Sequence, residues 1–318
     1  MAHRNRSANQ LVALLKRSTR NKDLADAQGE TIEAISEEDV LQALNEGKRI
    51  IQMAVANPCP WFSRALETVA ITSRLVEFPV PATALYGDRV FRLDYSLANS
   101  DRDFRPLEKG DPRENNYIEG EPCTYYHNGT NVIVEPAPSS GYYRFLIQRE
   151  DDQLDCRRGL VASVSALGGD LVSITLDTAD ALFNSINHEA LEAAEFVCVC
   201  DYRGENPLYN VPVQSYDRAT GVITARSGFA YTSGISAGMY VVAGQYTTTH
   251  SKLPSGFEDY VLAYARYRIL NWDSHSDQIQ EIPILQTIKA TLIEGITEQA
   301  GEETILENGN FLGDWFSK

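Results

Sequence analysis

Long helical patterns occur only near the two ends of this 318-residue chain, and short strand patterns fill the middle. Near one end, 36–57 has an apolar stripe in which residues recur at helical spacings. The stripe consists of Val40, Leu44, Ile51 and Val55. Near the other end, apolar residues in 256–300 repeat with a period near 3.6. Since neither helical region has a nearer helical partner, we expect the two to pack together as a small bundle.

The middle of the chain is predicted to form two β-rich blocks. In the first block, Asn128-Gly129 separates strand patterns at 123–127 and 131–134, and Asn-Gly is the strongest short-range signal for a hairpin. The second block, 156–250, holds several short strands separated by turns, which is typical of a small barrel or sandwich. The expected fold class is therefore α+β, with terminal helices forming a small bundle, an antiparallel β domain and an inserted small β-barrel or sandwich.

These patterns divide the chain into five segments. They are a basic N-terminal arm (1–35), a helix with an antiparallel β domain (36–155), an inserted β-rich domain (156–250), closing helices (251–301) and a C-terminal tail (302–318).

Composition excludes several classes of protein. The net charge of −16 argues against binding to nucleic-acid backbones, because that affinity comes mainly from Lys and Arg. The five cysteines fit no disulfide framework, and Cys198 and Cys200 are best explained as small buried side chains in a reducing compartment. No apolar stretch approaches the length of a membrane span, and the N-terminus lacks the apolar region of a secretory signal.

The first 22 residues carry six basic side chains and no acidic one. The arm also has one apolar helical face. We predict that it docks on an acidic partner through Arg4, Arg6, Lys16, Arg17 and Arg20. A frayed tail and a mitochondrial transit peptide are the alternatives, and the second is disfavoured because nothing else in the chain points to an organelle.

No motif indicates catalysis. Gly234-Ile-Ser236-Ala-Gly238 matches G-x-S-x-G, but a strand pattern follows where a nucleophile elbow needs a helix. Asp273, His275 and Asp277 have spacings that could hold a metal, although a solvated loop explains them better. We therefore expect no enzymatic activity, no metal and no cofactor.

The order of several motifs resembles the ring-forming head-to-tail adaptor (neck or connector) proteins of tailed bacteriophages. The stretches that carry the resemblance are Ser36-Glu-Glu-Asp with an asparagine later in the same helix, Gly120-Glu-Pro-Cys-Thr-Tyr-Tyr, Asn131-Val-Ile-Val-Glu-Pro-Ala-Pro, Tyr142-Tyr-Arg-Phe, and Leu253-Pro-Ser-Gly-Phe-Glu-Asp-Tyr-Val. The resemblance covers about 36–150 and 250–300 and does not include 156–250.

The resemblance implies a subunit of a dodecameric ring in the virion neck, made in the host cytoplasm. Such a ring would bind the portal protein above and a tail or nozzle protein below, and double-stranded DNA would pass without specific binding. Because adaptor termini commonly reach into clefts of the portal, it also implies portal docking by Phe311, Leu312, Trp315 and Phe316. A tail folded back on its own domain is the alternative.

Two other functions stay open. A tail-tube or tail-terminator protein would also be acidic and rich in strands. A binding module acting through 156–250 would show an exposed aromatic cluster on that block.

Overall fold

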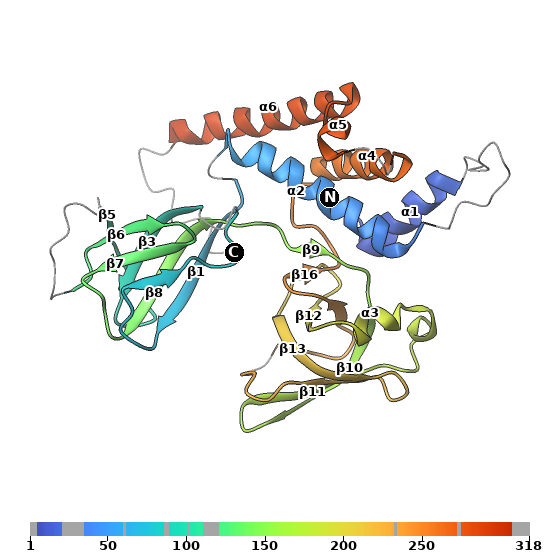
Figure 1. The fold of residues 1–318 in the computed structure, drawn as a ribbon, viewed down its shortest axis with the longest axis horizontal. Helices are drawn as coiled ribbons and strands as arrows, with labels where there is room; N and C mark the ends of the chain where they lie inside the picture. The colour runs from blue at the N-terminus through green and yellow to red at the C-terminus, as the bar shows by residue number, and fades with distance from the viewer. Residues whose placement is uncertain are drawn as a thin grey trace. The chain divides into compact units, whose positions relative to one another are not determined.

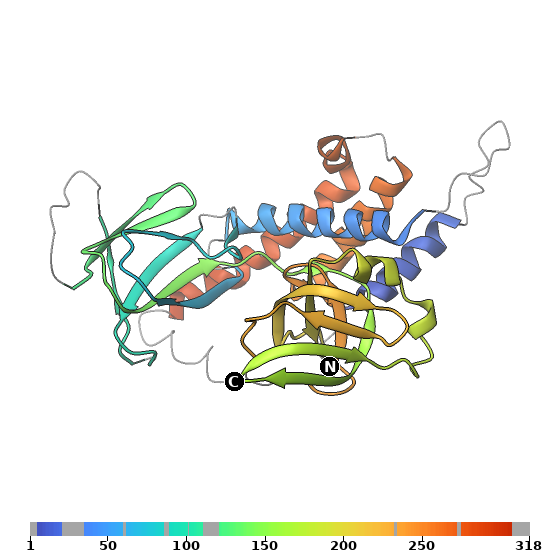
Figure 2. The same cartoon turned by 60° about the horizontal axis from the view of Figure 1, so that its bottom comes forward.

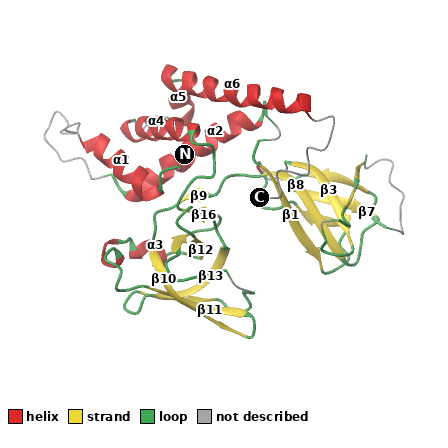
Figure 3. Cartoon of the chain, turned by 180° about the vertical axis from the view of Figure 1, so that it is seen from behind, coloured by secondary structure: helices red, strands yellow, loops and turns green. Residues whose placement is uncertain are grey.

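The computed structural model describes residues 5–20, 35–59, 62–85, 89–100, 102–110, 121–231, 234–271 and 275–306, with the side chains of 18–20 and 298–306 left aside. The chain forms two compact units, Met1–Ile51 with Asp152–Leu292 and Gln52–Asp151 with Ile293–Lys318. These boundaries differ from those of the five predicted segments, whose separate roles stay predictions. The expected α+β class is confirmed, with helices, antiparallel sheets and a closed barrel (Figures 1 and 3).

Outside the barrel block, the helices of the first unit come from both ends of the sequence, as expected. They are α1 (Ala8–Arg20), α2 (Glu37–Ala56), α4 (Gly256–Leu270), α5 (Ser276–Gln280) and α6 (Pro283–Leu306), of which α2 and α6 continue into the second unit. Ser36 caps α2, because its Oγ accepts a hydrogen bond from the backbone N of Asp39 at 3.0 Å. A Cβ placed on Gly47 would lie only 2.8 Å from Cδ1 of Tyr264, so α2 and α4 are in close contact.

Helix α1 packs on α4 within the first unit. Its apolar face is buried, and its members are Ala8, Leu11, Val12 and Leu15. The frayed-tail alternative is therefore wrong for Ala8–Arg20, since burial of this face against the chain's own helices gives the segment a fixed position.

The block 156–250 forms a closed barrel, so of the two expected forms, a small barrel and a sandwich, the barrel is confirmed. Its strands follow the order β10 (Gly159–Leu167), β11 (Asp170–Leu176), β14 (Val222–Ala225), β13 (Leu208–Asp217), β12 (Phe196–Cys200) and β15 (Tyr240–Ala243). Figure 2 brings this barrel toward the viewer. The short helix α3 (His188–Glu192) is part of the same block, and the short strands β9 (Gln153–Leu154) and β16 (Thr247–Thr248) pair in parallel beside it.

Strand β12 is buried on both faces. Val197 and Val199 belong to the barrel core, whereas Cys198 and Cys200 form a second buried cluster with Val242. The expectation that these two cysteines are small buried side chains is confirmed.

The second unit contains two four-stranded sheets that share one apolar core. One sheet has the order β1 (Arg64–Ile71), β8 (Gly141–Gln148), β3 (Val90–Ser96) and β4 (Arg105–Pro106). The other has the order β2 (Glu77–Pro79), β7 (Asn131–Glu135), β6 (Thr124–Asn128) and β5 (Glu108–Lys109). The predicted hairpin is β6–β7, where Asn128 pairs with Asn131 and Gly129 has a φ of 63°, a value that favours glycine.

None of the helices in the described part of the chain combines the length and apolar character that a membrane crossing requires.

Candidate functional site

Arg6, Lys16 and Arg17, which belong to the predicted N-terminal docking residues, lie on or next to α1. Arg6 is already used inside the chain, because its Nη1 lies 2.7 Å from Oε1 of Glu258 and its backbone N donates to Oε2 at 2.9 Å. Lys16 is half-buried and Arg17 is exposed. Arg4 and the side chain of Arg20 lie outside the described residues. Arg17 therefore remains as the best-placed described residue for the predicted docking, which stays a prediction.

The predicted portal-docking residues at the other end are not among those that the structure describes. Helix α6 is described as far as Leu306, and Phe311, Leu312, Trp315 and Phe316 come after it. Their docking role stays a prediction.

Asn45, the asparagine in the motif of the resemblance, holds one strand of the first unit to α2. Its Nδ2 donates to the backbone O of Leu154 at 2.9 Å, and its Oδ1 accepts from the backbone N of Leu154 at 2.7 Å. The side-chain amide thus pairs with Leu154 as a neighbouring strand would. Asn45 therefore anchors β9, the strand that leads into the barrel.

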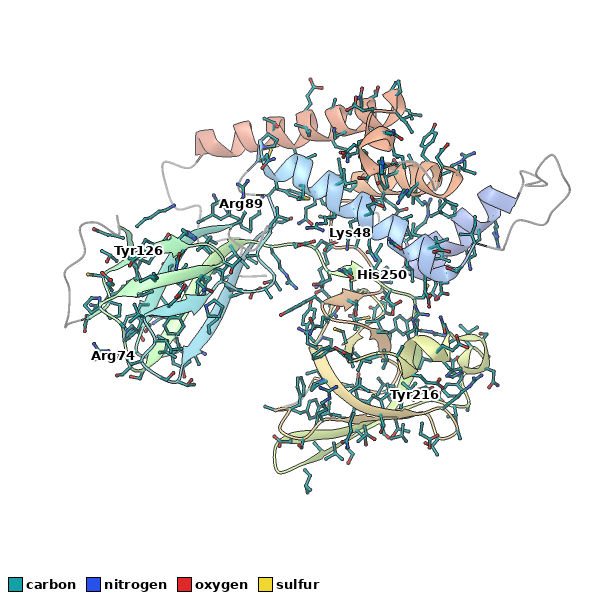
Figure 4. All side chains as sticks on the ribbon, viewed as in Figure 1. Lys48, Arg74, Arg89, Tyr126, Tyr216 and His250 are labelled. Atoms are coloured by element: carbon teal, nitrogen blue, oxygen red, sulfur yellow. The ribbon has the colours of Figure 1, made fainter. Side chains whose placement is uncertain are left out.

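Asp152, which is buried, joins three parts of the first unit through a partly buried polar cluster. Tyr209 Oη donates to Oδ2 of Asp152 at 2.7 Å, and Lys252 Nζ lies 3.2 Å from the same oxygen. Lys252 also donates to Tyr209 Oη at 3.0 Å, and Lys48 Nζ donates to the backbone O of Asp152. Figure 4 labels Lys48 on α2. Burial opposes the charge on Lys252, yet Asp152 and Tyr209 raise its pKa overall, so the amine stays protonated. These bonds hold α2, β13 and the segment before α4 to Asp152, so the role of the cluster is structural.

A second buried network ties the N-terminal end of α2 to the barrel. Arg158, which is 3% exposed, bonds the carboxylate of Asp155 through both Nε and Nη2 and reaches Glu37 of α2 through Nη1. A buried charge needs such partners, and a guanidinium serves two carboxylates well because its donors form a fixed fork. Together with Asn45 and Lys48, Arg158 fixes α2 to the start of the inserted block at three points.

The features weighed for catalysis do not form an active site in the described residues. Ser236 is exposed in a turn that leads into β15, so the helix required by a nucleophile elbow is missing there. His275 is the N-cap of α5 and Asp277 is in its first turn, while Asp273 is outside the described residues. No group of three metal-binding side chains occurs in the described ranges.

The setting of His188 was not predicted from the sequence. It is buried at 4% exposure, its Nε2 lies 2.8 Å from the backbone O of Phe183, and its Nδ1 lies 2.8 Å from Tyr216 Oη. Figure 4 labels Tyr216 in the barrel. Since a carbonyl only accepts, Nε2 carries a proton, and in the neutral ring Nδ1 then accepts from the Tyr216 hydroxyl. Nδ1 thus holds α3 to strand β13 of the barrel, and Nε2 holds it to the turn that precedes the helix. The sequence had no signal for this, because the three residues come from separate elements.

A binding module acting through 156–250 was expected to show an exposed aromatic cluster, and the described part of this block gives little support for one. Among the large hydrophobic side chains that are exposed on the described part of 156–250, Tyr202 is the aromatic one, and the guanidinium of Arg203 lies 5.2 Å from its ring centre. One stacked tyrosine is not a cluster.

No protein-family model matches the chain, and no curated protein matches it significantly. Functional assignment therefore depends on the residues and on the way in which the fold arranges them.

Proposed function

We propose that this protein is a non-catalytic structural subunit of the ring that joins the portal to the tail in a tailed bacteriophage. The observation that carries the proposal is the anchoring of α2. The capped helix with a central asparagine is the first motif of the resemblance, and here Asn45 binds both backbone groups of Leu154. The last motif forms α4, whose Tyr264 packs against Gly47 of α2. The first and last motifs of the resemblance thus build one helical core.

The charge of the chain is compatible with a channel for DNA. A net charge of −16 repels the phosphate backbone, so DNA would slide past a ring of such subunits without being held. The proposed partners are the portal protein, a tail or nozzle protein and further copies of the chain, in a dodecameric ring in the virion neck.

The test is to mix the full-length chain with purified portal rings encoded in the same genome. We expect electron micrographs to show an added collar at one end of the portal. We also expect the chain alone not to retain double-stranded DNA in a mobility-shift assay at physiological salt. A folded chain that leaves portal rings bare, or that binds DNA tightly, would contradict the proposal.

The same micrographs distinguish an adaptor from the nearest alternatives, a tail-tube protein and a tail terminator. Stacked tubes formed by the chain without a portal would favour a tail-tube protein, and a cap on isolated tails would favour a tail terminator.

A further inference from the structure

The barrel hairpin formed by β10 and β11 has one open edge. On that side, β15 pairs with β10 at Gly159 and Leu160, and the last bonds join Val161 to Gly238 and Met239 at 2.8 Å. Beyond them, the outer side of 162–167 carries no backbone partner among the residues that the structure describes. The other edge of the hairpin is covered, since Tyr231 N donates to the backbone O of Gly169 at 2.8 Å.

The open part of β10 is also exposed and uncharged. Leu167 at the tip is 78% exposed, and Ala162, Ser163, Ser165 and Ala166 are exposed beside it. In a chain of which 23% is charged, 159–169 contains no charged residue. Natural edge strands are usually protected by charge, proline or a covering element, because a bare edge pairs readily with another strand. Register shifts at Val161/Ser163 and Ser165/Ala166 interrupt the pairing of β10 with β11, but neither charge nor proline protects the open part. An edge that is exposed and uncharged to this extent fits a strand that is covered in the assembled state.

The second unit presents another long open edge. Strand β1 pairs with β8 along all eight of its residues and ends its sheet, and its outer side has no backbone partner within the described ranges. Leu66 and Val69 are each 37% exposed on it. The carboxylate of Glu67 accepts a hydrogen bond from Thr83 Oγ1, so this charge is engaged within the unit.

We propose that β1 of one copy adds to the open edge of β10 in the next copy, so that successive subunits are joined by a continuous sheet. This inference rests on the proposed ring. The pairing would be antiparallel, because that direction brings Arg64 at the start of β1 beside Leu167 at the end of β10. Asp170 pairs with Leu167 across the hairpin tip, so the long Arg64 side chain approaches an opposite charge one strand away. Main-chain hydrogen bonds would provide the affinity, as in other cases of strand addition.

A second copy is the partner that satisfies both edges. Symmetric pairing of β10 with β10 would cover one edge and leave β1 of both copies open. Pairing β1 with β10 covers both edges of every subunit, and a head-to-tail contact of this kind closes into a ring when the rotation between neighbouring copies completes a full turn. Charge also favours the pairing of β1 with β10. Copies with a net charge of −16 repel each other least where the two surfaces in contact are neutral or complementary in charge.

The test introduces lysines on either edge of the full-length protein. Ser165→Lys with Leu167→Lys blocks β10, the single change Leu167→Lys is a milder version, and Val69→Lys blocks β1. Leu182→Lys is the matched control, because Leu182 is 52% exposed on the same block and lies on neither edge. Self-association is measured by light scattering, and the number of subunits bound is measured on portal rings. Circular dichroism checks that each variant is folded.

We expect either block to weaken self-association at least tenfold and the control to leave it unchanged. Equal mixtures of the β10-blocked and β1-blocked chains should form dimers and no rings, since each mixture offers one intact pair of edges. Normal assembly of the β1-blocked chain, or no dimer in the mixture, would overturn the strand pairing. If edge-blocked chains still fill portal rings, the pairing fails and the adaptor function stands. If the unmodified chain binds neither itself nor the portal, both fail.

Discussion

Asn45 makes two hydrogen bonds to a backbone that has little access to water. Leu154 is 3% exposed, so Asn45→Ala leaves its N–H and C=O without these partners. Each unsatisfied buried group costs about 1–3 kcal/mol. We therefore expect Asn45→Ala to lower the free energy of unfolding by at least ~2 kcal/mol. Denaturant titration measures the loss, and Asn131→Ala, which removes an exposed hydrogen bond to Glu77, should change it far less.

Tyr260 should make the protein sensitive to alkali. Its side chain is 1% exposed, and burial raises its pKa to about 12 from an ordinary value of about 10. The folded state then keeps the phenol proton where the unfolded state has lost it. The stabilising contribution is complete below pH ~10 and falls as the pH rises toward about 12.

Tyr260→Phe removes the titrating group. The Tyr260 hydroxyl has no hydrogen-bond partner in the described structure, so its loss should not lower the melting temperature at pH 7. Melting curves between pH 9 and ~11.5 should show a smaller alkaline loss for this variant than for the unmodified chain. Tyr202→Phe, at an exposed position, is the control, and an equal improvement there would refute the assignment.

At the scale of elements, contact between α2 and α4 depends on a glycine. Alanine normally favours a helix over glycine by about 1 kcal/mol. At Gly47 the added Cβ would meet Tyr264 at 2.8 Å, and overpacking of this kind costs about 1–3 kcal/mol. We expect Gly47→Ala to lower the melting temperature. Gly295→Ala in α6, where nothing lies within 4 Å of the added Cβ, should raise it. A rise in both would show that α2 and α4 do not pack closely.

Elements with a local pattern were predictable, and contacts between distant elements were not. The capped start of α2 and the β6–β7 hairpin depend on neighbouring residues such as Ser36 and Gly129, so their sequence is sufficient to predict them. Closure of the barrel depends on pairing of β10 with β15, about 80 residues apart along the chain. Strand patterns alone do not distinguish a closed barrel from a sandwich.

The polar clusters were not predicted from the sequence, because they also depend on contacts between distant segments. Lys252 meets Asp152 and Tyr209 only after three segments converge, and none of the three residues belongs to a recognisable motif. The basic N-terminal arm was recognised from its charge, but Arg6 binds Glu258 of its own chain. Charge predicts that an arm is attracted to an acidic group, and it does not predict whether that group belongs to a partner.

At the scale of the whole molecule, the C-terminal end is the predicted link to the portal. Phe311, Leu312, Trp315 and Phe316 would expose apolar surface in a free tail, which water disfavours by about 25 cal/mol per Å². Large aromatic side chains are typical anchors in a partner's pocket. We expect truncation after Glu303 to abolish binding to portal rings and to leave the melting temperature unchanged, because the anchor is lost and the folded units keep their cores.

A full-length control tests whether portal binding depends on the apolar side chains of the tail or only on its presence. Replacing Phe311, Leu312, Trp315 and Phe316 by serine keeps the tail but removes its apolar surface, and it should weaken portal binding as much as the truncation does.

Arg17→Gln is the matching change on α1, where docking would depend on charge, so its effect should shrink as salt is added. The serine variant should lose affinity at every salt concentration. A truncated chain that binds the portal normally would exclude the tail as the anchor. A fall in melting temperature on truncation would instead show that the tail packs on its own unit.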